Sequence, residues 1–435
     1  MSSNPTPPRI GLRSALSLVI TSMVGTGVFT SLGFQLESLT QASTIVALWL
    51  LGGVIALCGA AVYAELGGLY PGSGGEFNFL TRLFHPLVGF LAGWISTVVG
   101  FSAPIALAAM AFGAYVTRLV PNVPETAAAA GAVVVMAVIH ARGVRLGLQV
   151  QRWVTATVLA MVLLLIVVGV MYPSGVSLAW QPSTELFSAS FAVSLIYVEY
   201  AYSGWNAAAY IAGEMERPER DLPRALIGGT ALVCVLYLAL NLTFLRSAPA
   251  DDLRGKVDVA YIAAEHFFGP AGARLMSVLL AGVLLGSVSS MLFAGARIPA
   301  VMAEGYTKLG WLHQRNAAGA PSRAVALQAA MALTMVATGS FQSVLTFIGF
   351  LLTACTTLAV AGLFVARARG VPSVSGYRCL GYPLTPMLFL VVNGWMLVFA
   401  LQAKPVAGLV GLAVILTGIP VWWWLDRQRT RLNAT

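Results

Sequence analysis

The sequence predicts an all-α integral membrane protein with about twelve transmembrane helices. Of its 435 residues, 58% are hydrophobic and 9% are charged, whereas a typical soluble domain carries roughly 25% charged residues. The hydrophobic residues form runs near the ~20 residues that a helix needs to cross the hydrocarbon core of a bilayer. The net charge of +9 is scattered between these runs. We therefore expect a lipid bilayer around the chain, and exclude a soluble enzyme, a disordered chain and a nucleic-acid partner.

Twelve apolar runs follow one another along the chain. Their approximate limits are 12–32, 42–67, 85–117, 126–141, 147–172, 188–212, 226–246, 272–302, 324–339, 341–366, 384–402 and 405–425. The first run is long and is followed by a polar turn rather than a cleavage site, which predicts a helix of the mature protein and not a signal peptide.

We expect one transmembrane domain over residues 1–425 and a cytoplasmic tail over 426–435. Helices one to five are expected at about 12–172, helices six to ten at about 188–366, and helices eleven and twelve at about 384–425.

The basic residues predict the orientation in the membrane. Placing the N-terminus in the cytoplasm puts 19 Lys and Arg residues in inner segments and 6 in outer segments. The positive-inside rule then predicts a multi-pass protein of the cell (inner) membrane with both termini cytoplasmic. An error in one span would scramble this asymmetry, so it also favours the count of twelve.

Cysteine and histidine chemistry is sparse. The four cysteines form no CxxC pair, and three of them lie in apolar runs, as small packing residues do. The four histidines are far apart and lack metal-ligand spacing. A membrane-embedded enzyme is the alternative from a different class. It is not favoured, because it would require clustered His, Asp or Cys residues. The longest outer segment, about 247–271, is too short for a soluble receptor domain.

The first span contains an interruption signal. Ser22 to Phe29 place two glycines around a threonine near its centre. Such a segment lets the helix open, and the freed backbone groups must then meet protein, water or a ligand. Close helix packing through small residues is the alternative interpretation.

The sixth span also contains an interruption signal. Its residues Glu199 to Asn206 put a carboxylate, three aromatic rings and small polar residues inside an apolar run. Spans one and six are corresponding positions if the chain consists of two five-helix halves. Interrupted helices at matching places are the best sequence indication of an inverted-repeat transporter, whose freed N–H and C=O groups hold a small zwitterion.

Four motifs resemble those of the amino acid–polyamine–organocation (APC) superfamily and its amino-acid permeases. In chain order they are Gly25–Phe29, Tyr63–Leu66 with Tyr70–Glu76, Gly213–Ala225, and Ala296–Gly305. The resemblance covers spans one to ten. It implies the LeuT-type 5+5 inverted repeat with interrupted helices 1 and 6, to which two further helices are appended.

The resemblance also implies roles for individual residues. Those implied to hold a substrate carboxylate through amides and one hydroxyl are Gly25, Thr26 and Gly27. Those implied to hold the α-amino group through carbonyls are Met23, Tyr200, Ala201 and Ser203. Tyr200 is also implied as an aromatic gate, and related exchangers carry the pair that corresponds to Trp205 and Asn206.

A sodium ion is the one cofactor that the sequence predicts. Several family members carry a lysine in the fifth span, where this chain has Val158. The residues that resemble the sodium site of LeuT-fold relatives are Thr21 and Val24, through their carbonyls, with Gly286, Ser289 and Ser290 on one helical face. Oxygen ligands suit a hard cation. The alternative is that both serines bond back to their own helix.

Glu199 is the other departure from the family pattern. A carboxylate in a membrane helix is a functional candidate by default, and this one is expected to accept a coupling proton or to pair with a cationic substrate. Its alternative is a location near a wet vestibule. Glu65 and Glu76, near or in the loop after span two, are expected to be structural.

We therefore predict a secondary transporter that moves amino acids by alternating access, with sodium coupling as one option. The alternative within transporters is a carrier of amines, polyamines or other organocations, proton-coupled or exchanging. A facilitator-type drug carrier is not favoured, because its basic loop after span two is replaced by Pro71 to Glu76. The particular substrate, the direction of transport and the oligomeric state do not follow from the sequence.

Overall fold

The computed structural model describes residues 10–72, 74–142, 144–171, 184–304, 306–316, 320–373 and 376–432. Within these ranges the chain is helical and contains no strand, apart from one isolated bridge between Ile10 and Met215. The helices are α1 (Leu12–Met23), α2 (Thr26–Gln35), α3 (Ala42–Leu69), α4 (Glu76–Leu83), α5 (Pro86–Ile95), the π-helical turn η1 (Ser96–Gly100), α6 (Ser102–Leu119), α7 (Glu125–Arg142), α8 (Val144–Met171), α9 (Ala189–Tyr202), the 3-10 helix η2 (Ala207–Glu214), α10 (Pro218–Ser247), α11 (Ala250–Leu253), α12 (Val259–Gly295), α13 (Arg297–Glu304), the 3-10 helix η3 (Thr307–Leu309), α14 (Gly310–His313), α15 (Ser322–Thr338), α16 (Phe341–Ala368), α17 (Leu384–Ala403) and α18 (Pro405–Leu432).

Nine helical segments of the described residues are long and apolar enough to cross a membrane. They are Leu12–Gln35, Ala42–Leu69, Pro86–Leu119, Glu125–Arg142, Pro218–Ser247, Val259–Pro299, Phe341–Ala368, Leu384–Ala403 and Gly408–Asp426. The prediction of an all-helical membrane protein is confirmed at this level.

Three of the predicted spans are not among these nine. The apolar part of α8 is the shorter segment Ala156–Met171, and residue 172, the predicted end of this span, lies outside the described residues. The helix α15 has 17 residues. The helix α9 has only 14 residues, because the sixth span stops being helical at Ser203.

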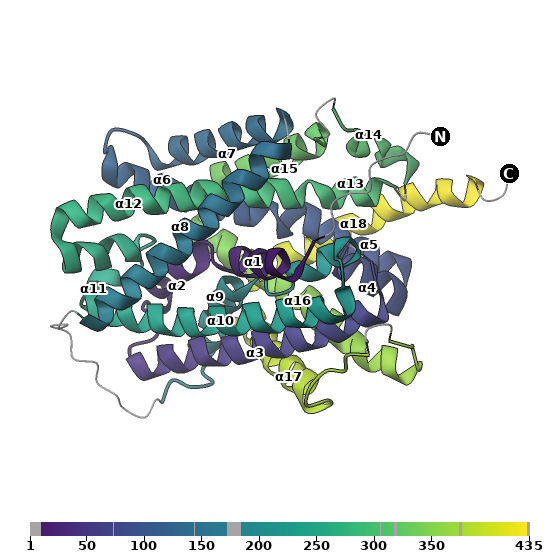
Figure 1. The fold of residues 1–435 in the computed structure, drawn as a ribbon, viewed down its shortest axis with the longest axis horizontal. Helices are drawn as coiled ribbons and strands as arrows, with labels where there is room; N and C mark the ends of the chain where they lie inside the picture. The colour runs from purple at the N-terminus through teal and green to yellow at the C-terminus, as the bar shows by residue number, and fades with distance from the viewer. Residues whose placement is uncertain are drawn as a thin grey trace.

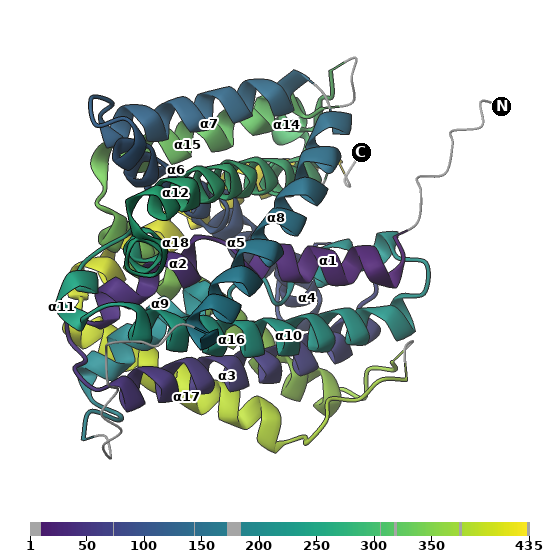
Figure 2. The same ribbon diagram turned by 60° about the vertical axis from the view of Figure 1, so that its left-hand side comes forward.

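The long helices run roughly parallel to one axis, and α8 crosses them diagonally (Figure 1). One end of the bundle carries α4, α13 and α14, and we call it the α4 end; the opposite end carries α11 and is called the α11 end. The helix α1 begins and α18 ends at the α4 end. Seen from a second direction, α7 and α15 lie along one edge of the bundle and α3 and α17 along another (Figure 2).

Burial separates the inner helices from the peripheral ones. Every residue of α2 is buried. By contrast, α7, α8 and α18 expose large apolar side chains, among them Val134, Val135, Val138, Leu163, Leu164, Val167, Leu409, Val410 and Leu416. Exposed apolar surface of this extent is suited to lipid.

Each end of the bundle is tied by contacts between distant segments. At the α11 end the loop after α11 covers α2, since the Gly255 N–H donates to the Gly33 carbonyl at 2.8 Å. Nearby, Arg118 of α6 pairs with Asp258 at 2.7 Å. At the α4 end the Glu65 carboxylate of α3 accepts two hydrogen bonds from Arg367 of α16, at 2.9 and 2.8 Å.

Candidate substrate site

The first span is broken between α1 and α2. The helix α1 ends at Met23, and Val24 (ψ 87°) and Gly25 (φ −133°, ψ −150°) leave the helical conformation before α2 begins at Thr26. The last carbonyls of α1 and the first N–H groups of α2 therefore lack partners within their own helices. A helix N-terminus also attracts negative charge. The break thus brings backbone donors and acceptors to one place in the protein interior.

The sixth span is broken as well. The helix α9 ends at Tyr202, Ser203 is extended (ψ 146°), and Gly204 has a φ of +101° before η2 begins at Ala207. Glycine is required at 204 for two reasons. A side chain is strained at this φ, and a Cβ would lie 2.6 Å from the Ser22 carbonyl carbon and oxygen.

The two breaks are in direct contact. The Gly204 position packs on the backbone of Ser22, and a Cβ on Gly27 would lie 2.5 Å from the Ala201 Cα. The first and sixth spans therefore meet at their interruptions, backbone against backbone.

Thr26 and Tyr200 face each other across this contact. Their hydroxyl oxygens lie 3.2 Å apart, and both side chains are buried. Thr26 is the first residue of α2 and Tyr200 belongs to the last turn of α9. The structure thus brings together two side chains to which the sequence analysis gave roles at one substrate.

Tyr237 is a residue that sequence reasoning missed. Its hydroxyl donates to the Met23 carbonyl at 2.5 Å and lies 3.2 Å from the Ala201 carbonyl oxygen. Its ring is fully buried and packs on Trp49 and Tyr202. Met23 and Ala201 supply two of the carbonyls predicted to hold an amino group, so Tyr237 satisfies them in this structure. The available signal was a lone tyrosine hydroxyl in the apolar run 226–246.

Trp205 and Asn206 make their contacts away from the Thr26–Tyr200 pair. The Trp205 ring meets Tyr63 of α3 edge-on with centroids 4.7 Å apart. The Asn206 amide donates to the Glu76 carboxylate of α4 at 2.6 Å. Both side chains hold the turn after Gly204 against α3 and α4 through these two interactions.

Glu199 is a buried carboxylate, 8% exposed, whose Oε1 atom has no hydrogen-bond partner among the described residues. The titratable groups with which it interacts electrostatically are Cys58 of α3, Cys234 of α10 and Tyr202 of α9. It forms no ion pair with a described residue. Glu199 directly precedes Tyr200 in the sequence, but its side chain points toward α3 and α10.

The residues predicted for sodium fit in part. The Ser290 hydroxyl donates to the Gly286 carbonyl at 2.8 Å, which is the back-bonding that the alternative anticipated and which leaves oxygen lone pairs. The Ser289 hydroxyl lies 2.6 Å from Nε2 of the buried His140 and so points toward α7. Val24 lies in the break, where carbonyls of α1 lack helical partners. The structure therefore directs the Ser289 side chain away from the predicted site, and the roles of Thr21, Val24, Gly286 and Ser290 stay predictions.

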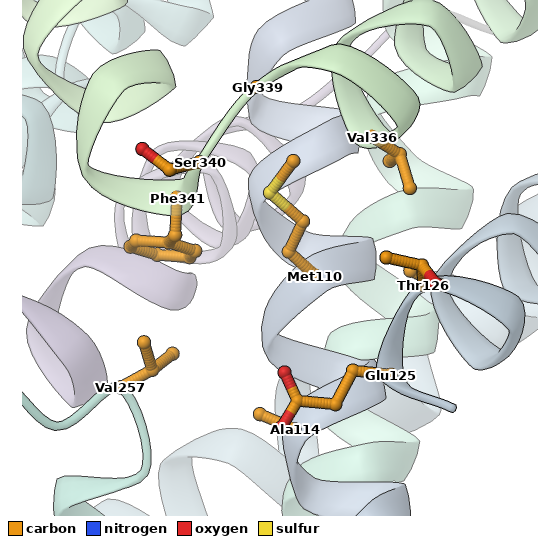
Figure 3. A pocket seen from close by; sticks show the side chains of 10 residues that line it. Met110, Ala114, Glu125, Thr126, Val257, Val336, Gly339, Ser340 and Phe341 are labelled. Carbon is orange, nitrogen blue, oxygen red and sulfur yellow. The ribbon is translucent and has the colours of Figure 1, made fainter. Parts of the chain in front are cut away.

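Two cavities lie apart from the breaks. One, of about 220 Å³, is at the α11 end between α6, α7, α15 and α16. Its walls include Met110, Val336 and Phe341, and the Glu125 carboxylate lies at its side (Figure 3). The other, of about 620 Å³, lies between the start of α10 and Tyr377 and is lined by Glu219, Arg220 and Arg224.

Multi-pass helical chains with two broken spans that present backbone donors and acceptors to each other are typical of secondary membrane transporters. The chain belongs to the amino acid permease family, whose model matches residues 10–425, and with it to the APC superfamily. Transport of amino acids, rather than enzymatic chemistry, is the activity of this family.

Several curated relatives are similar over nearly the whole chain. The large neutral amino acids transporter small subunit 2 of Rattus norvegicus is 28% identical over 95% of this chain and 80% of its own length. The serine/threonine exchanger SteT of Bacillus subtilis is 27% identical over 97% of both chains. The Asc-type amino acid transporter 1 of Homo sapiens is 28% identical over 95% of this chain and 81% of its own.

Proposed function

We propose that this permease carries amino acids across the cell membrane by alternating access, with one substrate site at the paired breaks of the first and sixth spans. The observation that carries this proposal is the backbone contact between Gly27 and Ala201 and between Gly204 and Ser22. It places a helix N-terminus, which favours an anion, beside carbonyls, which favour a cation. The α-carboxylate and α-ammonium of an amino acid need this combination.

In the proposed complex the carboxylate binds the amides of Gly25, Thr26 and Gly27 and the Thr26 hydroxyl. The ammonium binds the carbonyls of Met23, Tyr200, Ala201 and Ser203. Because the Tyr237 hydroxyl donates to the Met23 carbonyl and lies near the Ala201 carbonyl, the ammonium takes over acceptors that Tyr237 satisfies in its absence. The Tyr200 ring closes the site, and Trp205 and Asn206 support the turn that carries Ser203.

The proposed architecture is twelve spans in a LeuT-type 5+5 repeat with two appended helices. The three spans beyond the nine long helices are then α8, α15 and the broken pair α9–η2. The α4 end is cytoplasmic in this proposal, because α1 begins and α18 ends there and the basic residues predict cytoplasmic termini.

The coupling ion has two candidates. Sodium would be held by oxygens of Thr21, Val24, Gly286 and Ser290, and it would supply a fixed positive charge between α1 and α12. A proton would instead be held by Glu199, since an ionised carboxylate that is buried without a partner is costly. Ser290→Ala is expected to abolish a sodium requirement, and Glu199→Gln to flatten the pH dependence of uptake. Unchanged uptake without sodium would refute the first candidate, and an unchanged pH profile the second.

The second candidate function is a carrier of amines or other organocations, which Glu199 favours because its buried Oε1 atom has no hydrogen-bond partner among the described residues. One experiment separates the two functions. The purified protein is reconstituted in proteoliposomes, and counterflow is measured with a panel of neutral and cationic amino acids and of amines, with and without sodium and a pH gradient. We expect exchange of amino acids. Flux of amines alone would establish the second function, and absence of any amino acid flux would refute the first.

A further inference from the structure

Glu76 is a buried carboxylate that accepts hydrogen bonds from three side chains. It is the first residue of α4 and is 4% exposed. Its Oε1 atom accepts from the Tyr63 hydroxyl at 2.9 Å and from the Asn206 amide at 2.6 Å, and its Oε2 atom accepts from the Tyr210 hydroxyl. Three donors from two other elements, α3 and the broken sixth span, therefore converge on one side chain.

Two of these donors, Asn206 and Tyr210, belong to the turn and helix that follow the Gly204 break. Asn206 is the last residue before η2, and Tyr210 is in the middle of η2. Tyr63 also packs edge-on against Trp205, the residue between Gly204 and Asn206. The Glu76 carboxylate is thus linked, directly and through Tyr63, to the residues that follow the Gly204 break, next to the Ser203 carbonyl of the proposed amine site.

The backbone of the residues before Glu76 also contacts η2. The Gly74 N–H donates to the Tyr210 carbonyl at 3.1 Å. At Gly75, whose φ is +51°, a Cβ would lie 2.7 Å from the Tyr210 ring. Glycine at this position therefore lets the ring lie directly on the loop. These contacts give a physical reason for Gly74 and Gly75 in the Tyr70–Glu76 motif.

The loop and helix that contact η2, Gly74 to Leu83, are held in place by other parts of the protein. The helix α4 packs against α5 and α16, and Asn78 binds back to the Tyr70 carbonyl at 3.1 Å. A carboxylate that is buried without an ion-pair partner needs hydrogen bonds to be tolerated. Here the donors that satisfy it are those that fix η2 relative to α3 and α4.

We propose that Glu76 is a positioning residue for substrate binding: it holds Asn206 and Tyr210 so that the sixth-span turn presents its carbonyls in the geometry that binds the amino group. The inference rests on the proposed amino acid site. Without this hold, binding has to order η2 at the same time as it captures the substrate, and this entropy cost weakens affinity. The loss falls on KM more than on the rate of the loaded carrier.

The test is amino acid uptake by proteoliposomes with equal amounts of folded wild type, Glu76→Ala, Glu76→Gln and Tyr210→Phe. We expect KM to rise about tenfold or more in Glu76→Ala and roughly threefold in Tyr210→Phe, with maximal rates changed less. Glu76→Gln keeps one acceptor oxygen and is expected between wild type and Glu76→Ala. The double variant Glu76→Ala/Tyr210→Phe should be no worse than Glu76→Ala, because both remove one interaction.

Thr81→Ala is the matched control, since it removes a hydrogen bond within α4, from the Thr81 hydroxyl to the Phe77 carbonyl at 2.6 Å, and its KM should stay near that of wild type. If Glu76→Ala does not fold, Glu76→Gln and Tyr210→Phe carry the test alone. A KM within twofold of wild type in these folded variants, or independent effects in the double variant, would overturn the inference. Failure of the wild type itself to transport any amino acid would instead refute the proposed function.

Discussion

Glu76 and Glu199 flank the sixth-span break on its two sides, and they differ in what surrounds them. Both are buried, 4% and 8% exposed. Glu76 accepts hydrogen bonds from three side chains, whereas the Oε1 atom of Glu199 has no partner among the described residues. A satisfied buried carboxylate fixes the groups that donate to it, and an unsatisfied one retains the capacity to bind a proton or a cation. The difference separates a positioning role from a ligand role.

The largest effect is expected from Gly204→Ala, which deforms the turn between the two carboxylates. The new Cβ would lie 2.6 Å from the Ser22 backbone at a φ of +101°. Backbone strain of this kind costs about 1–3 kcal/mol, and the clash adds to it, so transport should fall more than tenfold. Initial uptake rates at matched expression measure this loss. Gly131→Ala on α7 is the control, because a Cβ there meets nothing within 4 Å; equal activity of the two variants would contradict the close contact of the breaks.

The next effect separates the two carboxylates through stability. Glu76→Gln exchanges an acceptor for an amide next to the Tyr63 and Tyr210 hydroxyls, and should lower the free energy of unfolding by about 1–3 kcal/mol. Glu199→Gln removes an acid whose Oε1 atom has no partner among the described residues, and should leave stability within about 1 kcal/mol of wild type or raise it. Thermal unfolding of both purified variants in one detergent gives the comparison. If both substitutions lower the free energy of unfolding equally, the different hydrogen bonding of Glu76 and Glu199 does not affect stability.

Tyr237→Phe should act on the substrate-free protein. It leaves the carbonyls of Met23 and Ala201 without the Tyr237 hydroxyl in a buried place, at a cost of about 1–3 kcal/mol. An added amino acid restores donors through its ammonium, so substrate should raise the unfolding temperature more in the variant than in wild type. If the substrate-induced shift is the same in both proteins, Tyr237 does not share acceptors with the ammonium.

Glu185, a carboxylate outside the spans, should give the smallest effect. Partial burial raises its pKa, but hydrogen bonds from the Thr40 hydroxyl at 2.7 Å and the Thr40 amide at 3.0 Å outweigh this, and the pKa is lowered. Its stabilising contribution is therefore present above the unfolded-state pKa of about 4.3 and is lost as the pH falls through the folded value. Glu185→Gln should cost under ~1 kcal/mol at pH 7 and less at pH 4. A constant difference in unfolding temperature at both values would contradict the assignment.

The sequence predicted the helical membrane class because apolar runs of sufficient length are a direct signal for spanning helices. It also located both interruptions, since clustered glycines and polar residues inside an apolar run are typical of a broken membrane helix. Span lengths were predicted less well at α9, because a break inside a run looks apolar on both sides and only coordinates show where the helix ends.

The two helix breaks were predictable, whereas the side-chain contacts around them were not. Local patterns of glycine and polar residues indicated the breaks, and the roles of Gly25 to Gly27 and of Tyr200 to Ser203 came from the family resemblance and stay predictions. Tyr237 and Glu76 reach the same region from 36 residues after Ala201 and from 130 residues before Asn206. Contacts over such separations produce no recognisable pattern in a single sequence. The sequence therefore indicated only a structural role for Glu76, and for Tyr237 only an aromatic ring in an apolar helix.

The central claim is that one amino acid binds at the paired breaks through both of its charged ends. Its most direct test is equilibrium competition for a radiolabelled transported amino acid on the purified protein. The competitors are the matching amine without a carboxylate and the matching acid without an amino group. We predict that each analogue binds at least ~100-fold more weakly than the amino acid, because each leaves either the α2 amides or the Met23 and Ala201 carbonyls unpaired. Competition by either analogue at the affinity of the amino acid itself would contradict the account.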